Sequence, residues 1–455
     1  MVSSPSLSLR LSRPNGRASC VVPPFFRVRR WRKLLNVHKL LPSTAQHIRC
    51  IHILRLQIST HTRARALRYT IMSNMADTVT ETQKEFIAIC KKGDLGAAKK
   101  MLSFASESPA SGFADACIQD PSDGMSPLMA AASAGSTEVV SLLLQHGAPW
   151  NALDRKGRCA GEYAMEAGHQ KVVDQLVDAG VRAEMILAAL DEKKRRGMMT
   201  RPPPSNRQYL ERDISYLSDG DTIVDKEKDA VMMAWEKPLM ELHAEVACAT
   251  KGHVLNIGFG LGLVDTAIQK RKPSAHTIIE AHPQVYRGMI KAGWDKKEGV
   301  NVVFGRWQDV ISKLGPFDAI FFDTYGEYYA DMRELHVQLP KLLKPGGVYS
   351  FFNGLCPHNV FFQGVMCQIV KLELAELGLS TQFIPVPVNS SPDSDTWKGV
   401  KRKYFHNDTY FLPICHFGNV APRDCDGRDR SEKMPSEADS SAMEKGNSTA
   451  PSNAE

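Results

Sequence analysis

Apolar residues change their spacing along this chain of 455 residues, and the changes divide it into parts. Over residues 80–182 they recur every three or four positions, which predicts amphipathic helices. Over residues 207–418 short apolar runs alternate with helical stretches, which predicts strands and helices in turn. Residues 183–206 pass from a charged helix end into three prolines, Pro202 to Pro204, and prolines cannot continue a helix. We therefore predict two folded units joined by a linker over 183–206.

The first unit carries an internal repeat. Gly124 returns as Gly157, and five further positions share this offset of thirty-three residues. The period is that of ankyrin repeats, and residues 126–131 (SPLMAA) resemble the T-P-L-H-x-A signature of that repeat. Residues 85–102 resemble an earlier repeat. The pattern predicts an all-α ankyrin-repeat domain over residues 80–182.

The second unit contains five short apolar runs, each followed by a polar or helical stretch. These runs predict strands at residues 254–257, 277–280, 301–304, 319–322 and 348–352. Strands that alternate with helices form a mainly parallel sheet with helices on both faces. We therefore predict an α/β, Rossmann-like domain over residues 207–418.

The two ends of the chain differ in composition from its body. Residues 1–71 hold twelve Arg, two Lys and no acidic residue. This composition fits a mitochondrial or chloroplast transit peptide, but we favour an extended gene model, with the protein starting at Met72 or Met75. Residues 419–455 are rich in Ser, Asp, Glu and Gly, and we expect this tail to be disordered.

Net charge and cysteine usage limit the choice of function. The net charge is +7, and the fourteen positive charges of the leader leave −7 for the rest. The overall charge is therefore no argument for a nucleic-acid partner. No run of eighteen apolar residues appears, so we expect no membrane span. The ten Cys form no C-x-x-C pair, and we predict reduced thiols and no metal site.

A glycine-rich loop, residues 258–262 (GFGLG), follows the first predicted strand of the second unit. Such a loop lets the backbone approach a ligand closely at a helix N-terminus. Glu280 ends the next strand, where a carboxylate accepts hydrogen bonds from ribose hydroxyls. Trp307 and Gln308 follow the third strand, beside the expected adenine, and Asp323 follows the fourth. These positions predict a nucleotide-like cofactor at the carboxyl ends of the strands.

The order of these motifs, with residues 342–347 (LLKPGG) before the fifth strand, resembles that of class I methyltransferases. Residues 231–240 (VMMAWEKPLM) further resemble a block of guanidinoacetate methyltransferase. Together with the ankyrin-like repeats, the chain is similar to the fungal and plant protein arginine N-methyltransferase 2 family, which methylates the internal δ-nitrogen of arginine. The resemblance implies a class I (Rossmann-like) methyltransferase domain preceded by an all-α ankyrin-repeat domain.

The resemblance also implies S-adenosyl-L-methionine as methyl donor and a set of residues that contact it. These are Tyr216, Met232, Met240, Phe259, Gly260, Leu261, Gly262, Leu263, Val264, Glu280, Ala281, His282, Trp307, Gln308 and Asp323. The assignment of Tyr216 rests on the shortest matching stretch of sequence.

Glu236 and Asp323 are the candidate catalytic residues, since the resemblance places both against the guanidinium. A guanidinium arrives charged, with a pKa of about 12.5–13.8, and is a poor nucleophile. Carboxylates can clamp its planar fork and localise its charge, and one of them can accept a proton. Residues 323–331 lack the two-glutamate pattern of ordinary protein arginine methyltransferases, which argues against asymmetric dimethylation.

We therefore expect monomethylation of arginine in a protein substrate docked by the ankyrin repeats. We expect no nucleic-acid or membrane partner, a monomer, and a cytoplasmic and nuclear location. A genuine transit peptide over residues 1–71 would instead direct the protein to a mitochondrion or chloroplast. Two alternatives remain: a small-molecule guanidino methyltransferase of the guanidinoacetate type, and an ankyrin scaffold whose methyltransferase domain is inactive.

Overall fold

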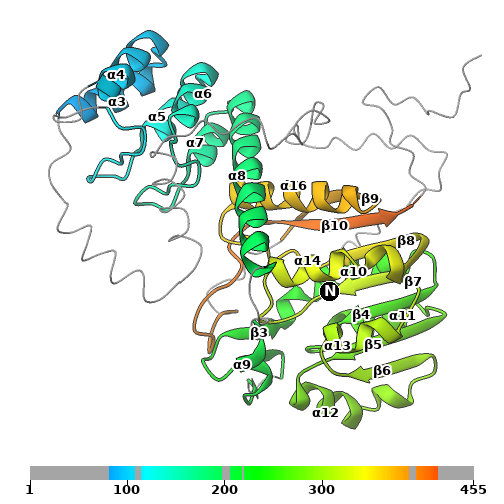
Figure 1. Cartoon of the computed structure of the whole chain (residues 1–455). Helices are drawn as coiled ribbons and strands as arrows, with labels where there is room; N and C mark the ends of the chain where they lie inside the picture. Colours follow the sequence, from blue (N-terminus) through cyan, green and yellow to red (C-terminus); the bar gives the residue numbers. More distant parts are fainter. Residues whose placement is uncertain (1–80, 108–113, 197–204, 218–219, 389–395, 419–455) are drawn as a thin grey trace, which may run out of the picture.

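The computed structural model describes residues 81–107, 114–196, 205–217, 220–388 and 396–418. The predicted leader (1–71) and tail (419–455) lie outside these residues. The described chain forms a helical N-terminal unit and an α/β C-terminal unit, which lie against each other in Figure 1.

Helices alone build the N-terminal unit in the described part of the chain. Ser126 caps α5 by accepting a hydrogen bond from Met129 N at 3.1 Å, and Pro127 occupies the first turn. Ser136 caps α6 in the same way. Capping side chains of this kind satisfy backbone N–H groups that have no partner in the helix. The helices are α3 (Glu81–Lys92), α4 (Leu95–Glu107), α5 (Pro127–Ser133), α6 (Thr137–Gln145), α7 (Ala160–Glu166) and α8 (Gln170–Arg196).

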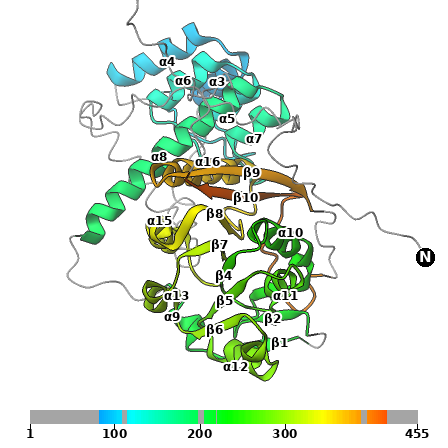
Figure 2. The same ribbon diagram turned by 90° about the vertical axis from the view of Figure 1, so that its right-hand side faces the viewer.

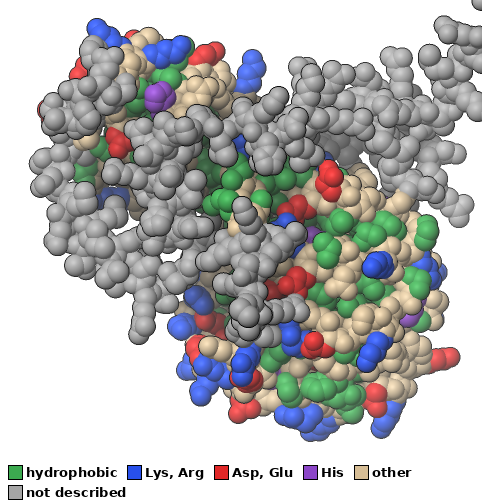
Figure 3. Space-filling model, viewed as in Figure 1, with side chains coloured by type: hydrophobic (Ala, Val, Ile, Leu, Met, Phe, Trp, Pro, Cys, Tyr) green, Lys and Arg blue, Asp and Glu red, His purple; other side chains and the backbone are tan. Residues whose placement is uncertain are grey.

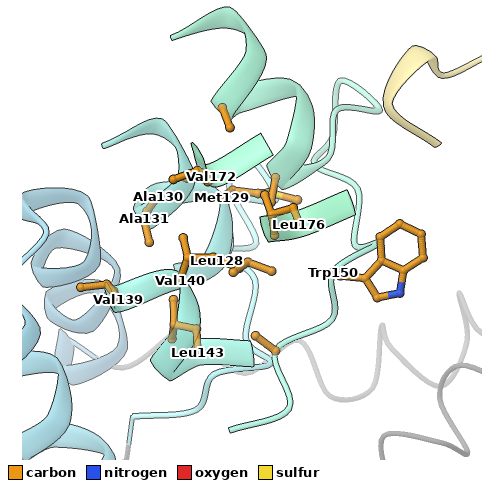
Figure 4. Close-up of a cluster of buried hydrophobic side chains, with 14 of the residues drawn as sticks. Leu128, Met129, Ala130, Ala131, Val139, Val140, Leu143, Trp150, Val172 and Leu176 are labelled. Atoms are coloured by element: carbon orange, nitrogen blue, oxygen red, sulfur yellow. The ribbon is translucent and has the colours of Figure 1, made fainter. Parts of the chain in front are cut away.

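The repeated apolar positions form the core of this unit. Leu128, Leu143 and Leu176 come from α5, α6 and α8, and all three are completely buried. Figure 4 shows them facing one another among smaller side chains. Helix α5 packs between α3 and α7, so each helical pair buries its apolar face on the next. The structure thus has the stacked helical pairs that the thirty-three-residue period predicts.

Helix α8 is longer than the repeat requires. It continues to Arg196 and so runs through the first part of the predicted linker over 183–206. The helix also contacts α16, and packing against another element stabilises helical turns that a free linker would lose.

The C-terminal unit is built on a sheet of seven strands with the order β6-β5-β4-β7-β8-β10-β9. Strands β6, β5, β4, β7 and β8 are parallel, whereas β10 runs antiparallel to both of its neighbours. The strands are β4 (His253–Ile257), β5 (Ala275–Glu280), β6 (Val300–Phe304), β7 (Phe317–Phe322), β8 (Leu343–Phe351), β9 (Leu379–Pro387) and β10 (Thr409–Phe417).

Successive side chains of each central strand face opposite layers of helices. Val254 of β4 and Phe321 of β7 pack with α10 and α11, and Leu255 and Phe322 pack on the other face with the helices from α13 to α16. The helices are α10 (Lys237–Ala247), α11 (Leu263–Lys270), α12 (Pro283–Lys291), η4 (Trp294–Lys296), α13 (Trp307–Val310), η5 (Ile311–Lys313), α14 (Tyr329–His336), α15 (Leu339–Leu342) and α16 (Val360–Glu376).

A small antiparallel sheet precedes the seven-stranded sheet in the chain. It has the order β1-β2-β3, and its last strand passes directly into a short 3₁₀ turn before α10. The elements are α9 (Arg207–Leu210), β1 (Ser215–Tyr216), β2 (Thr222–Val224), β3 (Ala230–Met233) and η3 (Ala234–Glu236).

Helix α16 belongs to the cores of both units. Val370 and Leu374 pack on the sheet side, whereas Phe361, Val365 and Ile369 belong to the ankyrin core. Figure 2 shows the ankyrin helices stacked on α16, with β9 and β10 beyond it. A helix that is apolar all round must be covered on every side, and here the two units provide the cover.

The fold class agrees with the sequence prediction, since all five predicted strands are present as β4 to β8. Strands β9 and β10 were not predicted, because Pro385 and Pro413 interrupt their apolar pattern. On the face seen in Figure 3, acidic and basic side chains intermingle over the C-terminal unit. Among the described residues no helix is long and apolar enough to cross a membrane.

Candidate active site

A cleft opens at the carboxyl ends of β4, β5 and β7, and it encloses about 700 Å³ of empty space when the open solvent at its mouth is included. The chain order of the strands reverses at β4, which has β5 on one side and β7 on the other. Open α/β sheets bind ligands at such a reversal. Tyr209 and Leu210 of α9 close the opposite wall.

Gly258 shows why the loop after β4 is rich in glycine. Its φ is +99°, and a Cβ at this position would lie 1.7 Å from the carbonyl oxygen of Asp323. The backbone N of Gly258 also donates to the carbonyl of Ile279 at 2.9 Å. A side chain here would force apart the strand ends that make the cleft, so the residue sets the spacing of the site.

Glu280 lines the cleft at the end of β5. Its two carboxylate oxygens accept backbone hydrogen bonds from Phe259 N at 2.9 Å and His282 N at 2.6 Å. Burial raises the pKa of this carboxyl, and backbone donors, including these two, oppose the shift. The acid is thus fixed against the glycine loop, with its carboxylate edge in the cleft where the ribose of a nucleotide would lie.

The structure brings most of the predicted methyl-donor residues to this cleft. Those that line it are Met232, Phe259, Gly260, Val264, Glu280, Ala281, Trp307, Gln308 and Asp323. Those that do not are Tyr216, Met240, Leu261, Gly262, Leu263 and His282.

The residues outside the lining support it from behind or lie to one side. Met240 is completely buried in the same cluster as Met232, and Leu261 N lies 3.2 Å from the Met232 sulfur. Tyr216 is half exposed on β1, and Tyr209 of α9 lines the wall near it. His282 holds Glu280 through its backbone N–H.

Glu327 lines the cleft, and its role was not predicted from the sequence. Its carboxylate accepts hydrogen bonds from Trp307 Nε1 at 2.9 Å and Gln308 Nε2 at 2.7 Å. Thr324 Oγ1 donates to it at 2.8 Å, and Asn206 Nδ2 at 3.4 Å. The side chain therefore holds in place the two residues predicted to lie beside the adenine.

Glu236 and Asp323 interact with each other at one side of the cleft, which Asp323 lines and Glu236 does not. Glu236 is 3% exposed at the end of η3, and Asp323 follows β7 and faces the cleft. Glu236 accepts a hydrogen bond from Met233 N at 3.3 Å and another from the hydroxyl of Tyr404. Glu236 forms no salt bridge with any residue that the structure describes, and an acid buried this deeply without a basic partner favours a role in binding a cation.

Both carboxyls hold their protons unusually tightly. Burial raises the pKa of Glu236 to about 8, and the negative charge of Asp323 adds to the effect. Burial raises the pKa of Asp323 to about 7. Two acids in a shared apolar site cannot both ionise easily. A planar cation between them would remove this penalty, and a guanidinium matches two carboxylates in charge and shape.

Comparisons with known proteins agree with this geometry. A family model described as Guanidinoacetate N-methyltransferase matches residues 205–371, and one described as Ankyrin repeats (3 copies) matches residues 86–185. The chain is also similar to proteins named Protein arginine N-methyltransferase 2, three of which follow.

The relative from Aspergillus oryzae is 34% identical over 61% of this chain and 77% of its own length. The relative from Saccharomyces cerevisiae is 33% identical over 62% of this chain and 77% of its own length. The relative from Aspergillus fumigatus is 31% identical over 66% of this chain and 89% of its own length.

The chain belongs to the protein arginine N-methyltransferase 2 family. In this family member α16 packs with the ankyrin core and with the sheet of the methyltransferase unit, and the glycine loop and Glu280 line the cleft. The family match confirms the fold and enzyme class that the sequence predicted. The described residues contain no cluster of three or more His, Cys, Asp or Glu with metal-site geometry.

Sequence reasoning missed Glu327, Tyr209 and Tyr404. Tyr209 and Tyr404 lie outside the five-strand motif order, on α9 and on the connection between β9 and β10. Glu327 lies within residues 323–331, which the sequence analysis used only to exclude a two-glutamate loop. The available signal was its position four residues after Asp323, close enough to reach the same strand end.

Proposed function

We propose that this protein transfers the methyl group of S-adenosylmethionine to the internal δ-nitrogen of arginine in a protein substrate. The observation that carries the proposal is the pair of acids Glu236, which is buried, and Asp323, which is half-buried and lines the cleft. The names of the relatives support arginine as acceptor. The ankyrin unit supports a macromolecular substrate, since a small acceptor needs no docking surface.

The donor site follows from the lining of the cleft. Glu280 and Gly260 line the cleft; Glu280 would hold the ribose hydroxyls of the donor, and the backbone around Gly260 would bind its amino-acid part. Trp307 and Gln308, fixed by Glu327, bound the adenine. S-adenosylmethionine supplies an electrophilic methyl group on a positively charged sulfur. Met232 and Asp323 line the cleft, and we expect the acceptor nitrogen on the side of Glu236.

The two carboxylates act on the acceptor. They neutralise the guanidinium, hold it in one plane, and draw its charge toward the nitrogens that they contact, so that the lone pair of the remaining nitrogen can attack. As the nitrogen–carbon bond forms and the carbon–sulfur bond breaks, the nitrogen gives its proton to one of the carboxylates. Their raised pKa values suit them to receive it.

Monomethylation follows from the choice of nitrogen. The internal nitrogen of an arginine guanidino group carries a single hydrogen, so it accepts one methyl group and then has none left to replace. The clamp favours this nitrogen, because bidentate contacts to the two terminal nitrogens leave the internal one facing the donor.

The decisive experiment incubates the full chain and labelled S-adenosylmethionine with an extract of cells that lack the enzyme. Labelled proteins are hydrolysed and their amino acids identified. We expect δ-N-monomethylarginine, lost with Glu236→Gln and with Asp323→Asn. Label on a terminal nitrogen would refute the assignment of the nitrogen, and no labelled protein would refute the assignment of the substrate class.

A second candidate is methylation of a small guanidino compound. The match of residues 205–371 to the guanidinoacetate N-methyltransferase model favours it. Guanidinoacetate offered in place of protein separates the two functions, because transfer to guanidinoacetate without transfer to protein would establish the second.

A further inference from the structure

The connection between β9 and β10 covers the acceptor side of Glu236. Its described part, residues 396–408, carries Trp397, Tyr404 and Phe405, and all three rings pack against the ring of Trp235. The rings of Trp235 and Tyr404 have their centroids 5.8 Å apart. The residue before the buried acid is thus enclosed by an aromatic group that belongs to a distant part of the chain.

Hydrogen bonds run through this group toward the acid. Trp235 Nε1 donates to the hydroxyl oxygen of Tyr404 at 3.0 Å, and the Tyr404 hydroxyl donates to Glu236 Oε1. The same oxygen accepts the backbone N–H of Met233 at 3.3 Å. An indole N–H only donates, so it fixes the direction of the chain. Two donors on Oε1 leave Oε2 as the oxygen available to a ligand.

We propose that Tyr404 is a positioning residue that locks the rotamer of Glu236, so that its Oε2 faces the acceptor guanidinium. The proposal rests on the proposed function, because it concerns the acceptor site of that same reaction. It assigns a role to the segment between β9 and β10, for which the motifs around the cofactor cleft predict none.

The chemistry of the contact fits this role. A hydroxyl that donates to a carboxylate stabilises the ionised form, which is the form that binds a cation. The titratable groups facing Glu236 are Asp323 at the end of β7, Tyr404 from the connection, and Tyr410 of β10. Asp323 and burial favour the protonated acid, and Tyr404 opposes them. The pKa of Tyr404 itself lies well above its usual value, so its hydroxyl remains a donor.

The connection is anchored on both sides of Tyr404. Arg402 forms two hydrogen bonds with the carboxylate of Asp229, at 2.9 and 2.8 Å, and Lys401 N donates to the carbonyl of Lys228 at 2.8 Å. On the other side, His406 N donates to the carbonyl of Pro357 at 3.0 Å. Because the backbone is held on both sides of Tyr404, its side chain loses little conformational entropy when it forms the hydrogen bond with Glu236. This favours a fixed positioning role for Tyr404 over a transient contact.

The test compares Tyr404→Phe with the wild-type full chain and a matched variant. Removing the hydroxyl should lower kcat by about 10- to 100-fold, as expected for one hydrogen bond to a charged group. The acidic limb of the pH–rate profile should move to higher pH, because Glu236 loses a donor. Trp235→Phe should also lower kcat and move the acidic limb to higher pH, but both effects should be smaller than in Tyr404→Phe. Tyr329 is the matched control, because its part-buried hydroxyl donates to the carboxylate of Glu373. Tyr329→Phe should change neither kcat nor the pH–rate profile.

A second readout does not depend on activity. The carboxyl carbon of Glu236, labelled with ¹³C and assigned by its loss in Glu236→Gln, is titrated by NMR. We expect a higher pKa in Tyr404→Phe than in the wild type. If the wild type methylates no arginine but the titration shifts, the positioning role stands and the proposed function fails. An unchanged titration and pH profile in Tyr404→Phe, even with reduced turnover, would overturn the positioning role.

Discussion

The interface between the two units and the carboxylate site are both buried, but they have opposite chemistry. At the interface, Phe361 of α16 is 1% exposed and packs on Trp150, with ring centroids 6.5 Å apart. At the site, Glu236 and Asp323 share a space that raises the pKa of both. Burial of apolar area stabilises the first region by about 25 cal/mol per Å². Burial of like charges destabilises the second.

This difference separates the stabilising part of the molecule from the reactive part. Two neighbouring carboxyls without a bound cation lower the stability of the folded protein. The rest of the fold must therefore contribute the stabilising free energy that the site lacks. Helix α16 supplies part of it by joining two cores that would each be incomplete alone. Four experiments can separate the stabilising region from the reactive region.

Glu236→Gln should reduce methyl transfer by about a thousandfold or more, since one arm of the guanidinium clamp loses its charge. The same change should stabilise the free protein. The pKa of Glu236 is raised in the folded state, so its stabilising contribution is lost as pH rises through about 8. At pH 8.5 we expect a gain of roughly 1–2 kcal/mol, or a Tm higher by about 2–8 °C.

Thermal unfolding at pH 8.5 and at pH 5 provides the check for that variant. The gain should shrink at pH 5, where the wild-type acid is protonated. A loss of stability at pH 8.5 would mean that the acid contributes to the fold and is not strained.

Phe361→Ala should destabilise the whole chain by about 3–5 kcal/mol, because it empties the joint core of α16 and the ankyrin helices. Gly161→Ala should act on the same contact, since its Cβ would lie 2.2 Å from the Phe361 ring. Denaturant unfolding measures both. Phe304→Ala, at a ring that is 49% exposed, is the control and should cost far less. Separate unfolding of the two units in the wild type would show that α16 does not join them cooperatively.

Acceptor binding should depend on pH in the direction set by the carboxyls. Protonation removes the charges that hold the guanidinium, so affinity should weaken by roughly several hundredfold from pH 8 to pH 6, through pKa values of about 8 and 7. Calorimetric titration with an arginine peptide measures it. A double variant, Glu236→Gln with Asp323→Asn, should lose the dependence, and equal wild-type affinity at both pH values would contradict the clamp.

Asn359 offers the smallest test. Its side chain caps α16 by accepting from Phe362 N at 2.9 Å and donates to Glu162 of the ankyrin unit at 2.7 Å. Asn359→Ala should cost about 1 kcal/mol, the usual value of a helix cap. Asn359→Ser keeps an acceptor for the cap but cannot reach Glu162, so unfolding of the two variants separates the cap from the link between units. Equal losses of unfolding free energy in the two variants would assign the whole effect to the hydrogen bond between Asn359 and Glu162.

Local patterns made the five parallel strands, the repeat period and the glycine loop predictable. Each depends on short-range rules: strands alternate their faces, ankyrin helices repeat at a fixed offset, and only glycine fits where Gly258 approaches Asp323. Glu236 and Asp323 were named from the family resemblance, and their proximity could not be read from the sequence.

The sequence by itself therefore determined the two units, the sheet that carries the cleft, and the residue types available for chemistry. Tertiary structure alone decided that α16 serves two cores, that Glu327 fixes Trp307 and Gln308, and that Tyr404 reaches Glu236 across 168 positions. These features arise from burial and hydrogen bonds between distant segments. No local periodicity records them, because they exist only once the chain has closed around the site.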